Sequence, residues 1–190
     1  RRPLDGTLPS MASTFVPTVI RREIDAQPSA ARATCFDCPA RTSDLCSHLP
    51  EETIADLFAA AGKIHLKRGE PLVLDGDAAN SAYNVVDGTL MLTRHGPDGR
   101  RQVLAFLSRG HFIGLSSDDV YHFNAEALND VTLCRFDRAR LERLLREHPV
   151  MEKKLRHIAA KIIESALDLV FTLGRKDAVG RVSAFLVHLH

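Results

Sequence analysis

The sequence predicts a mainly β fold with added helices, in which an antiparallel sandwich or roll precedes one long helix. Two observations lead to this prediction. Between residues 64 and 136, short apolar runs alternate with Gly, Asp and Asn turn signals. Strands of this length, with turns at roughly 8–12-residue spacing, are typical of antiparallel sandwiches and rolls. After residue 137 the apolar residues recur at helical spacing instead.

Composition sets the broad class of the protein. The 190 residues are 45% hydrophobic and 26% charged, which suits a single globular core. A net charge of +1 gives the whole chain no strong attraction to nucleic acid. No apolar run approaches the roughly 20 residues that cross a bilayer, and no secretory signal opens the chain. We therefore expect a cytoplasmic protein with reduced thiols and no membrane partner.

Four parts are expected along the chain. Residues 1–33 carry four prolines and no sustained period, which predicts a flexible segment. Residues 34–148 hold a cysteine loop and the roll, which together form the expected sensor domain. Residues 149–174 form the expected dimerisation helix. Residues 175–190 begin a further domain and stop inside an apolar helical pattern, so we expect the chain to be a fragment.

Local signals place the first helix and the strands. Pro50 and the two acids that follow it open a short helix over residues 53–61, which Gly62 is expected to stop. A last strand is expected over residues 128–136, because apolar residues alternate there. The other expected strands contain residues 72–74, 83–86, 90–92 and 103–107.

The helices after the roll have signals at their ends. Asp137 is expected to cap a helix over residues 138–147. Pro149 starts a long helix, with Gly174 placed just past its end. A last helical pattern covers residues 178–190.

The long helix carries the pattern of a coiled-coil seam. A second apolar row, Ile163, Leu167 and Val170, lies beside the seam, while Lys154 and other charged residues stay outside. Two adjacent rows need two partners, so we expect one row on the helix's own roll and the other on the same helix of a second subunit. The alternative is that both rows pack inside the monomer. The predicted homodimer seam consists of residues spaced 4, 3, 4, 3 and 4 apart: Leu155, Ala159, Ile162, Ala166, Leu169 and Leu173.

The cysteines suggest a metal centre. Cys35, Cys38 and Cys46 fall within twelve residues, and the only other cysteine is Cys134. A close trio on a polar loop with one distant partner can enclose a metal and tie the loop to the body of the domain. Gain or loss of the metal would then change the shape of both parts, which favours a sensor over a catalyst.

Three interpretations of the four cysteines stay open on spacing alone. An iron–sulfur cluster tolerates unequal, distributed ligands and fits the pattern best. A structural zinc site more often uses two close cysteine pairs, whereas here there is one pair, one single and one remote cysteine. The third interpretation is that Cys134 is a small buried side chain on a strand and no site is shared.

Sequence motifs for catalysis are missing. The chain has no recognisable nucleophile motif, no glycine loop that cradles phosphate and no helical His pair around a glutamate. Its nine histidines are scattered. We therefore expect a protein that is not an enzyme.

Several passages resemble the CRP/FNR family of bacterial transcription regulators. They are Lys67-Arg68-Gly69-Glu70, Val86-Asp87-Gly88-Thr89-Leu90 and Arg109-Gly110-His111-Phe112-Ile113-Gly114, within a resemblance over about residues 34–190. The resemblance implies a cyclic-nucleotide-binding-type β-roll, or double-stranded jelly roll, followed by a long dimerisation helix. It also implies a helix-turn-helix DNA-binding domain, of which residues 175–190 are the truncated start and the rest follows residue 190. Through this domain a homodimer would bind operator DNA and act with RNA polymerase, as an activator.

Within this family the cysteines resemble those of the oxygen-sensing FNR branch. There, four such thiolates hold a [4Fe–4S] cluster, which implies that Cys35, Cys38, Cys46 and Cys134 are the ligands here. Seven residues separate Cys38 from Cys46, a longer gap than in the enterobacterial type and similar to the FnrN-like regulators of rhizobia. The resemblance further implies that oxygen destroys the cluster, frees the loop and weakens the dimer. Zinc remains the alternative cofactor.

Cyclic nucleotide is not expected as a ligand. Binders in this family show Gly-Glu and later Arg-Ser/Thr-Ala, whereas this chain has Gly114-Leu115 and Phe123-Asn124-Ala125. Between Gly114 and Cys134 there is no Lys or Arg, while several acids occur there. A buried phosphate would therefore lack a cationic partner. The remaining alternatives are a family member with zinc or no metal that responds to another signal, and an effector-sensing module that does not bind DNA.

Overall fold

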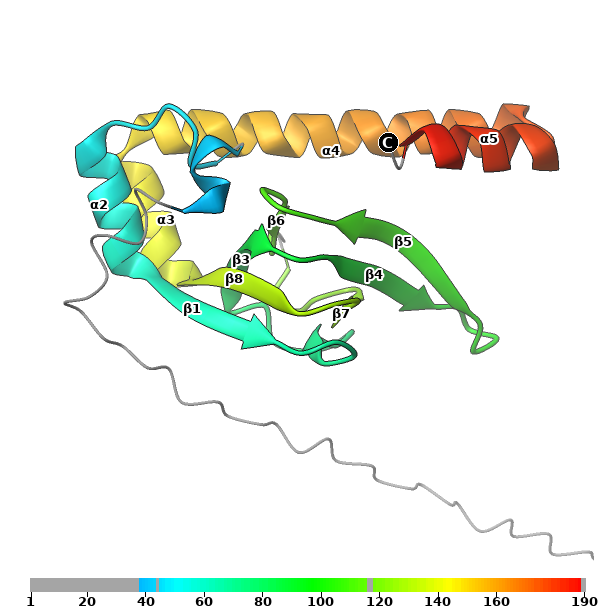
Figure 1. The fold of residues 1–190 in the computed structure, drawn as a ribbon, viewed down its shortest axis with the longest axis horizontal. Coiled ribbons are helices and arrows are strands. Elements are labelled where there is room, and N and C mark those ends of the chain that lie inside the picture. Colours follow the sequence, from blue (N-terminus) through cyan, green and yellow to red (C-terminus); the bar gives the residue numbers. More distant parts are fainter. Residues whose placement is uncertain (1–37, 44, 116–117, 189–190) are drawn as a thin grey trace, which may run out of the picture.

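The computed structural model describes residues 38–43, 45–115 and 118–188, and it confirms a roll of two antiparallel sheets followed by a long helix (Figure 1). In chain order the elements are η1 (Pro39–Thr42), α2 (Glu51–Ala60), β1 (Ala61–Leu66), β2 (Pro71–Val73), β3 (Ser81–Asp87), β4 (Leu90–His95), β5 (Arg101–Leu107), β6 (Phe112–Ile113), β7 (Asn124–Ala127), β8 (Val131–Asp137), α3 (Arg138–Glu147), α4 (Pro149–Arg175) and α5 (Ala178–His188). The expected flexible segment, residues 1–33, lies outside the described residues.

The two sheets have four strands each. One has the order β1-β8-β3-β6 and the other β2-β7-β4-β5. In the first sheet β8 lies between β1 and β3, and Cys134 stands opposite Lys63 on one side and Asn84 on the other. Because successive strand residues face opposite sides, Cys134 and its neighbour Leu133 point away from each other. Leu133 packs in the core of the roll, and Cys134 packs against the core beneath the helices.

Two hydrophobic cores therefore share the first sheet. The core of the roll includes Val85, Leu90 and Leu133, each with no exposed surface. The second core joins the sheet to the helices and to the cysteine loop, and consists of Leu45, Leu49, Ile54, Leu57, Ala60, Ala82, Phe112, Phe136, Leu141, Leu144, Met151, Leu155 and Ile158. The cysteine loop is thus part of the same packed unit as the start of α4.

The helices after the roll follow their predicted signals closely. Asp137 caps α3 by accepting a hydrogen bond from the backbone N–H of Arg140 at 3.1 Å. His148 ends α3 and precedes α4, whose first residue is Pro149. Gly174 was expected to end the long helix, but α4 continues to Arg175 because Gly174 does not adopt the left-handed conformation of a helix terminus.

Other boundaries differ from the predictions for local reasons. α2 covers Glu51–Ala60 instead of 53–61, and Gly62 lies inside strand β1 instead of stopping the helix. The last strand begins at Val131 instead of residue 128, because Leu128 and Asn129 bond to Thr89 in a turn. β7, with the sequence Asn-Ala-Glu-Ala, was not predicted because none of these residues favours strands.

Candidate metal centre

The described part of the cysteine loop is held by one arginine. Arg41, in η1, donates hydrogen bonds to the carbonyl oxygen of Cys46 and, at 3.4 Å, to that of Leu49. Leu45 and Leu49 are buried on either side of Cys46. The loop is therefore anchored by two apolar side chains and by a guanidinium that binds its carbonyl groups. Cys35 lies outside the described residues.

Cys46 and Cys134 approach the same buried side chain. Asn84 of β3 stands opposite Cys134 of β8, and its Nδ2 group donates to the Sγ atom of Cys46 at 4.0 Å. Directly opposite residues in an antiparallel pair have Cα atoms about 4.5–5.5 Å apart. The loop cysteine and the strand cysteine, far apart in sequence, are thus neighbours of one amide.

The electrostatics of Cys46 reflect both burial and neighbouring charges. Burial raises the pKa of the Cys46 thiol from its ordinary value of 9.0 to about 11, and nearby Cys38 also raises this pKa. The positive charges of Arg41 and Lys154 act in the opposite direction and lower it. Without a metal the Cys46 thiol is protonated at neutral pH, so binding of a metal must displace its proton.

The three described cysteines are near one another without forming a finished site. Over residues 38–43, 45–115 and 118–188, no three His, Cys, Asp or Glu side chains are grouped closely enough to hold a metal ion. The donors nevertheless suit a thiolate-ligated centre. Cys38 lies within electrostatic range of Cys46, two cations offset the thiolate charge, and the buried Asn84 Oδ1 atom has no partner among the described residues. Cys38, Cys46 and Cys134 are donors of the type that a metal or an iron–sulfur cluster would need.

Lys154 connects the cysteine loop directly to the long helix. Its Nζ atom donates to the Oγ atom of Ser47 at 2.9 Å. The expectation that Lys154 stays outside is wrong, because the loop folds back across the first turns of α4 and half-buries this side chain. Sequence spacing on the helix gave no sign of this contact, since the partner lies 107 positions earlier in the chain.

The junction between α3 and α4 is fixed by α2. The ring of His148 contacts the Thr53 hydroxyl at 3.2 Å through Nδ1 and the Asp56 carboxylate at 3.0 Å through Nε2. Thr53 is buried and follows the cysteine loop by only a few residues. The hinge before the long helix is therefore held by the helix that directly follows the cysteine loop.

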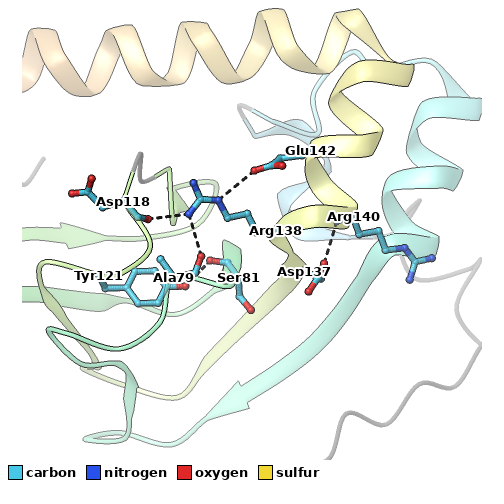
Figure 2. Close-up of polar contacts among 8 residues, drawn as sticks. All are labelled: Ala79, Ser81, Asp118, Tyr121, Asp137, Arg138, Arg140 and Glu142. Carbon is cyan, nitrogen blue, oxygen red and sulfur yellow. Dashed lines mark hydrogen bonds and ion pairs between the residues drawn. The ribbon is translucent and has the colours of Figure 1, made fainter.

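The junction between β8 and α3 is held by a second set of polar contacts. Figure 2 shows Arg138, at the start of α3, reaching the carbonyl oxygens of Asp118 at 2.9 Å and Ala79 at 3.4 Å, and the carboxylate of Glu142 at 3.3 Å. In the same view the hydroxyl group of Tyr121 donates to the Ser81 carbonyl oxygen at 2.5 Å. The start of α3 is thus held to the chain around Ala79 and Asp118.

These contacts also involve the segment between Gly114 and Cys134, which would have to supply a cation for a bound nucleotide phosphate. Tyr121 is buried in the core of the roll, where it contacts the ring of Phe123. One expectation needs correction: a cation does reach this region, because Arg138 enters it from α3. The guanidinium is already engaged by two carbonyl groups and one carboxylate.

The long helix separates into a supported base and an exposed remainder. Leu155 of the predicted seam is buried in its own subunit, and Ala159 is partly buried. From residue 161 to 171 every residue of α4 is exposed. The expected packing of the second row on its own roll is therefore wrong: Ile163, Leu167 and Val170 are each at least 60% exposed, because the roll reaches only the first turns of the helix. The seam residues beyond the base, Ile162, Ala166, Leu169 and Leu173, are also exposed.

Sequence reasoning missed three residues of this site: Arg41, Asn84 and Lys154. Asn84 had a local signal, because an asparagine stands in the middle of an apolar strand pattern. Arg41 lies between the cysteines but matches no motif.

None of the helices in the described ranges is long and apolar enough to span a membrane.

Comparisons with known proteins agree with this architecture. The model of the cyclic nucleotide-binding domain matches residues 63–148. FixK, a nitrogen fixation regulation protein of Bradyrhizobium diazoefficiens, is 33% identical over 153 residues, which cover 80% of this chain and 65% of that protein. The transcriptional activator FnrL of Cereibacter sphaeroides is 26% identical over 171 residues, covering 90% of this chain and 64% of that protein.

A solved structure gives the same result. FixK2 from Bradyrhizobium japonicum superposes with a TM-score of 0.62 at 30% identity, over 67% of this chain and 65% of that one. The chain spans just under two thirds of the length of the relatives named above. By fold and by homology, the chain belongs to the CRP/FNR family of transcription regulators.

Proposed function

We propose that this chain is the sensory and dimerisation portion of an oxygen-responsive transcription regulator. In this proposal Cys35, Cys38, Cys46 and Cys134 hold a [4Fe–4S] cluster that controls dimerisation and DNA binding. The observation that carries the proposal is the meeting of loop and strand: Cys46 and Cys134 both adjoin Asn84. The relationship to FnrL, a transcriptional activator, is consistent with this branch of the family.

The charges around the cysteines suit such a centre. Four thiolates bring negative charge into a partly buried site, and Arg41 and Lys154 supply nearby positive charge. When bound, the cluster supplies the sensing chemistry, because it reacts with oxygen and is lost. The protein's part is to hold the loop against β8 while the sulfurs are ligated.

Two connections lead from the cysteines to the dimerisation helix. Cys134 lies on β8, which continues through Asp137 into α3 and then α4. Cys46 lies next to Ser47, which accepts a hydrogen bond from Lys154 of α4. Because both connections end at the base of α4, ligation of the sulfurs can bias how that helix pairs with a second subunit.

The proposed output is DNA binding by a homodimer. The exposed seam of α4, including Ile162, Leu169 and Leu173, supplies the surface for the second subunit. Operator DNA would be bound through a domain outside this sequence, with RNA polymerase as the further partner. Loss of the dimer would lower affinity for DNA, since two half-sites must be held together.

Cyclic nucleotide is not the proposed effector, although the matching domain model carries that name. Tyr121 lies in the core of the roll and Arg138 is committed to protein groups. The acids Asp118 and Asp119 would also repel a phosphate, whereas Asp130 and Glu126 are paired with Lys67 and Arg101.

Purification without oxygen tests the proposal. We expect a brown protein with about four iron and four sulfide ions per chain, and a dimer that dissociates after exposure to air. Cys134→Ser should remove the iron while leaving the folded roll intact. Ser43→Ala, a small change in the cysteine loop at a residue that is no ligand, is the control and should keep the iron.

The alternatives give different results in the same experiment. Colourless protein with one zinc ion per chain would reject the cluster in favour of a zinc-stabilised regulator. Protein free of any metal, with all four cysteines open to alkylation, would reject both and leave a regulator of another signal or an effector-sensing module.

A further inference from the structure

Asn84 is an unusual residue for its position. It lies in the middle of β3 with only 2% of its surface exposed, between Cys134 of β8 and Phe112 of β6. Asparagine disfavours strands, and a buried amide without full hydrogen bonding destabilises the fold. Its Oδ1 atom has no hydrogen-bond partner among the described residues. A side chain with these disadvantages calls for a functional explanation.

The amide nitrogen of Asn84 faces the sulfur of Cys46, one of the four proposed ligands. Asn84 Nδ2 donates to Cys46 Sγ at 4.0 Å, and Cys134 is its neighbour across the strands. Phe112 and Phe136, which stack with ring centroids 6.4 Å apart, form an apolar surrounding. In a dry environment an N–H donor interacts more strongly with a negative sulfur than it would in water.

From these contacts we infer that Asn84 is a positioning residue that donates to the ligating sulfur of Cys46 and sets how readily the centre is oxidised. The inference rests on the proposed function, because it requires a cluster on the four cysteines. Hydrogen bonds to cluster sulfurs are among the factors that set reduction potential. A donor withdraws electron density from the sulfur and makes removal of an electron harder. Asn84 would therefore slow the loss of the cluster when dissolved oxygen is the electron acceptor.

One substitution distinguishes a role of Asn84 at the cluster from a role in stabilising the fold. Asn84→Leu keeps the size of the side chain but removes both the donor and the unsatisfied oxygen. Removal of an unsatisfied buried polar atom is neutral or stabilising for the metal-free fold. The same substitution should weaken the metal-loaded state. A merely structural asparagine would change both states in the same direction.

The experiment compares Asn84→Leu with wild type in two measurements. In air-saturated buffer, the visible absorption of the anaerobically purified, cluster-loaded chain should decay roughly tenfold faster or more in the variant, as expected for loss of one hydrogen bond to a charged group. The thermal midpoint of the metal-free chain should stay the same or rise. Thr93→Val, a buried polar residue of β4 in the other sheet, is the matched control and should leave the decay rate unchanged.

A second variant covers the case in which Asn84→Leu does not load. Asn84→Thr keeps one donor, so it should load and decay at an intermediate rate. Equal decay rates in wild type and Asn84→Leu would overturn the role of Asn84 while leaving the proposed function standing. Failure of Asn84→Thr to improve on Asn84→Leu would also overturn it. Iron-free wild-type protein would overturn the proposed function and this inference together.

Discussion

The proposed dimer seam of α4 gives the most direct quantitative prediction. Ile162, Leu169 and Leu173 are each about half exposed in the single subunit, at 51%, 51% and 50%. Complete burial of such a side chain contributes about 1.5–3 kcal/mol, so covering the exposed half contributes roughly 1 kcal/mol per side chain. A symmetric seam places each of these residues near its own copy in the second subunit.

Ile162→Glu should dissociate the dimer even in the cluster-loaded state. The change removes the burial of two isoleucines and brings two carboxylates together across the seam, a combined loss of about 3 kcal/mol or more. Each 1.4 kcal/mol is about tenfold in affinity, so the dimer should weaken by at least roughly 100-fold. The fold of the subunit should not change, because residue 162 has no support from its own roll and surface substitutions shift stability little.

Sedimentation equilibrium of anaerobic, iron-loaded protein measures this effect. His157→Glu adds the same charge to an exposed position on the outer side of the same helix, so it serves as the matched control. The reasoning would be refuted if Ile162→Glu dimerised within threefold of wild type. It would also be refuted if His157→Glu weakened the dimer as much as Ile162→Glu did.

Three further predictions concern the supporting structure. Met151→Ala should lower the free energy of unfolding by about 2–5 kcal/mol, measured with urea, because Met151 is fully buried where the loop meets α4; a loss below 1 kcal/mol would contradict that packing. Gly88→Ala should destabilise the roll by more than about 1 kcal/mol, since Gly88 has φ +86° and an added Cβ atom would strike the Asp130 carbonyl oxygen; an unchanged thermal midpoint would contradict the turn geometry. In metal-free protein the raised pKa of Cys46 means that the folded state keeps its proton longer than the unfolded state, so stability should be fully present below pH 9.0 and fall as pH rises towards about 11. Cys46→Ser should flatten that fall, and identical pH profiles would count against the burial of the thiol.

Predictions from local patterns succeeded where the deciding interaction is local. Asp137 caps α3 from the adjacent position, and Pro149 begins α4 one residue after His148. The predictions that Gly62 stops the first helix and that Gly174 ends the long helix were wrong, because they depended on the local backbone conformation of each glycine. A glycine favours the end of a helix chiefly because it can adopt the left-handed conformation, and neither glycine does so here.

The site could be predicted only in part. The spacing of its loop cysteines can be read from a short stretch of sequence, but the contacts that bring them to β8 join residues far apart in the chain. The spacing of Cys35, Cys38 and Cys46 was visible in the sequence, whereas the register that places Asn84 opposite Cys134 depends on pairing of β3 with β8. Lys154 illustrates the same limit. Its position on the helix indicated solvent, and only the path of the cysteine loop shows that Ser47 covers it.

The geometry of α4 explains how small changes at the cysteines could alter pairing of the subunits. The buried residues of the helix, Met151, Leu155 and Ile158, all lie in its first turns, and residues 161–171 are exposed, so the roll supports the helix mainly at its base. At about 1.5 Å per residue, the exposed part up to Arg175 extends roughly 25 Å from that base. A rotation of about 5° at the base would therefore move the far end by roughly 2 Å, enough to disturb close packing of side chains across a seam. Because Lys154 and Met151 lie within that base, the proposed release of the cysteine loop would act where a small rotation has its largest effect on the dimer.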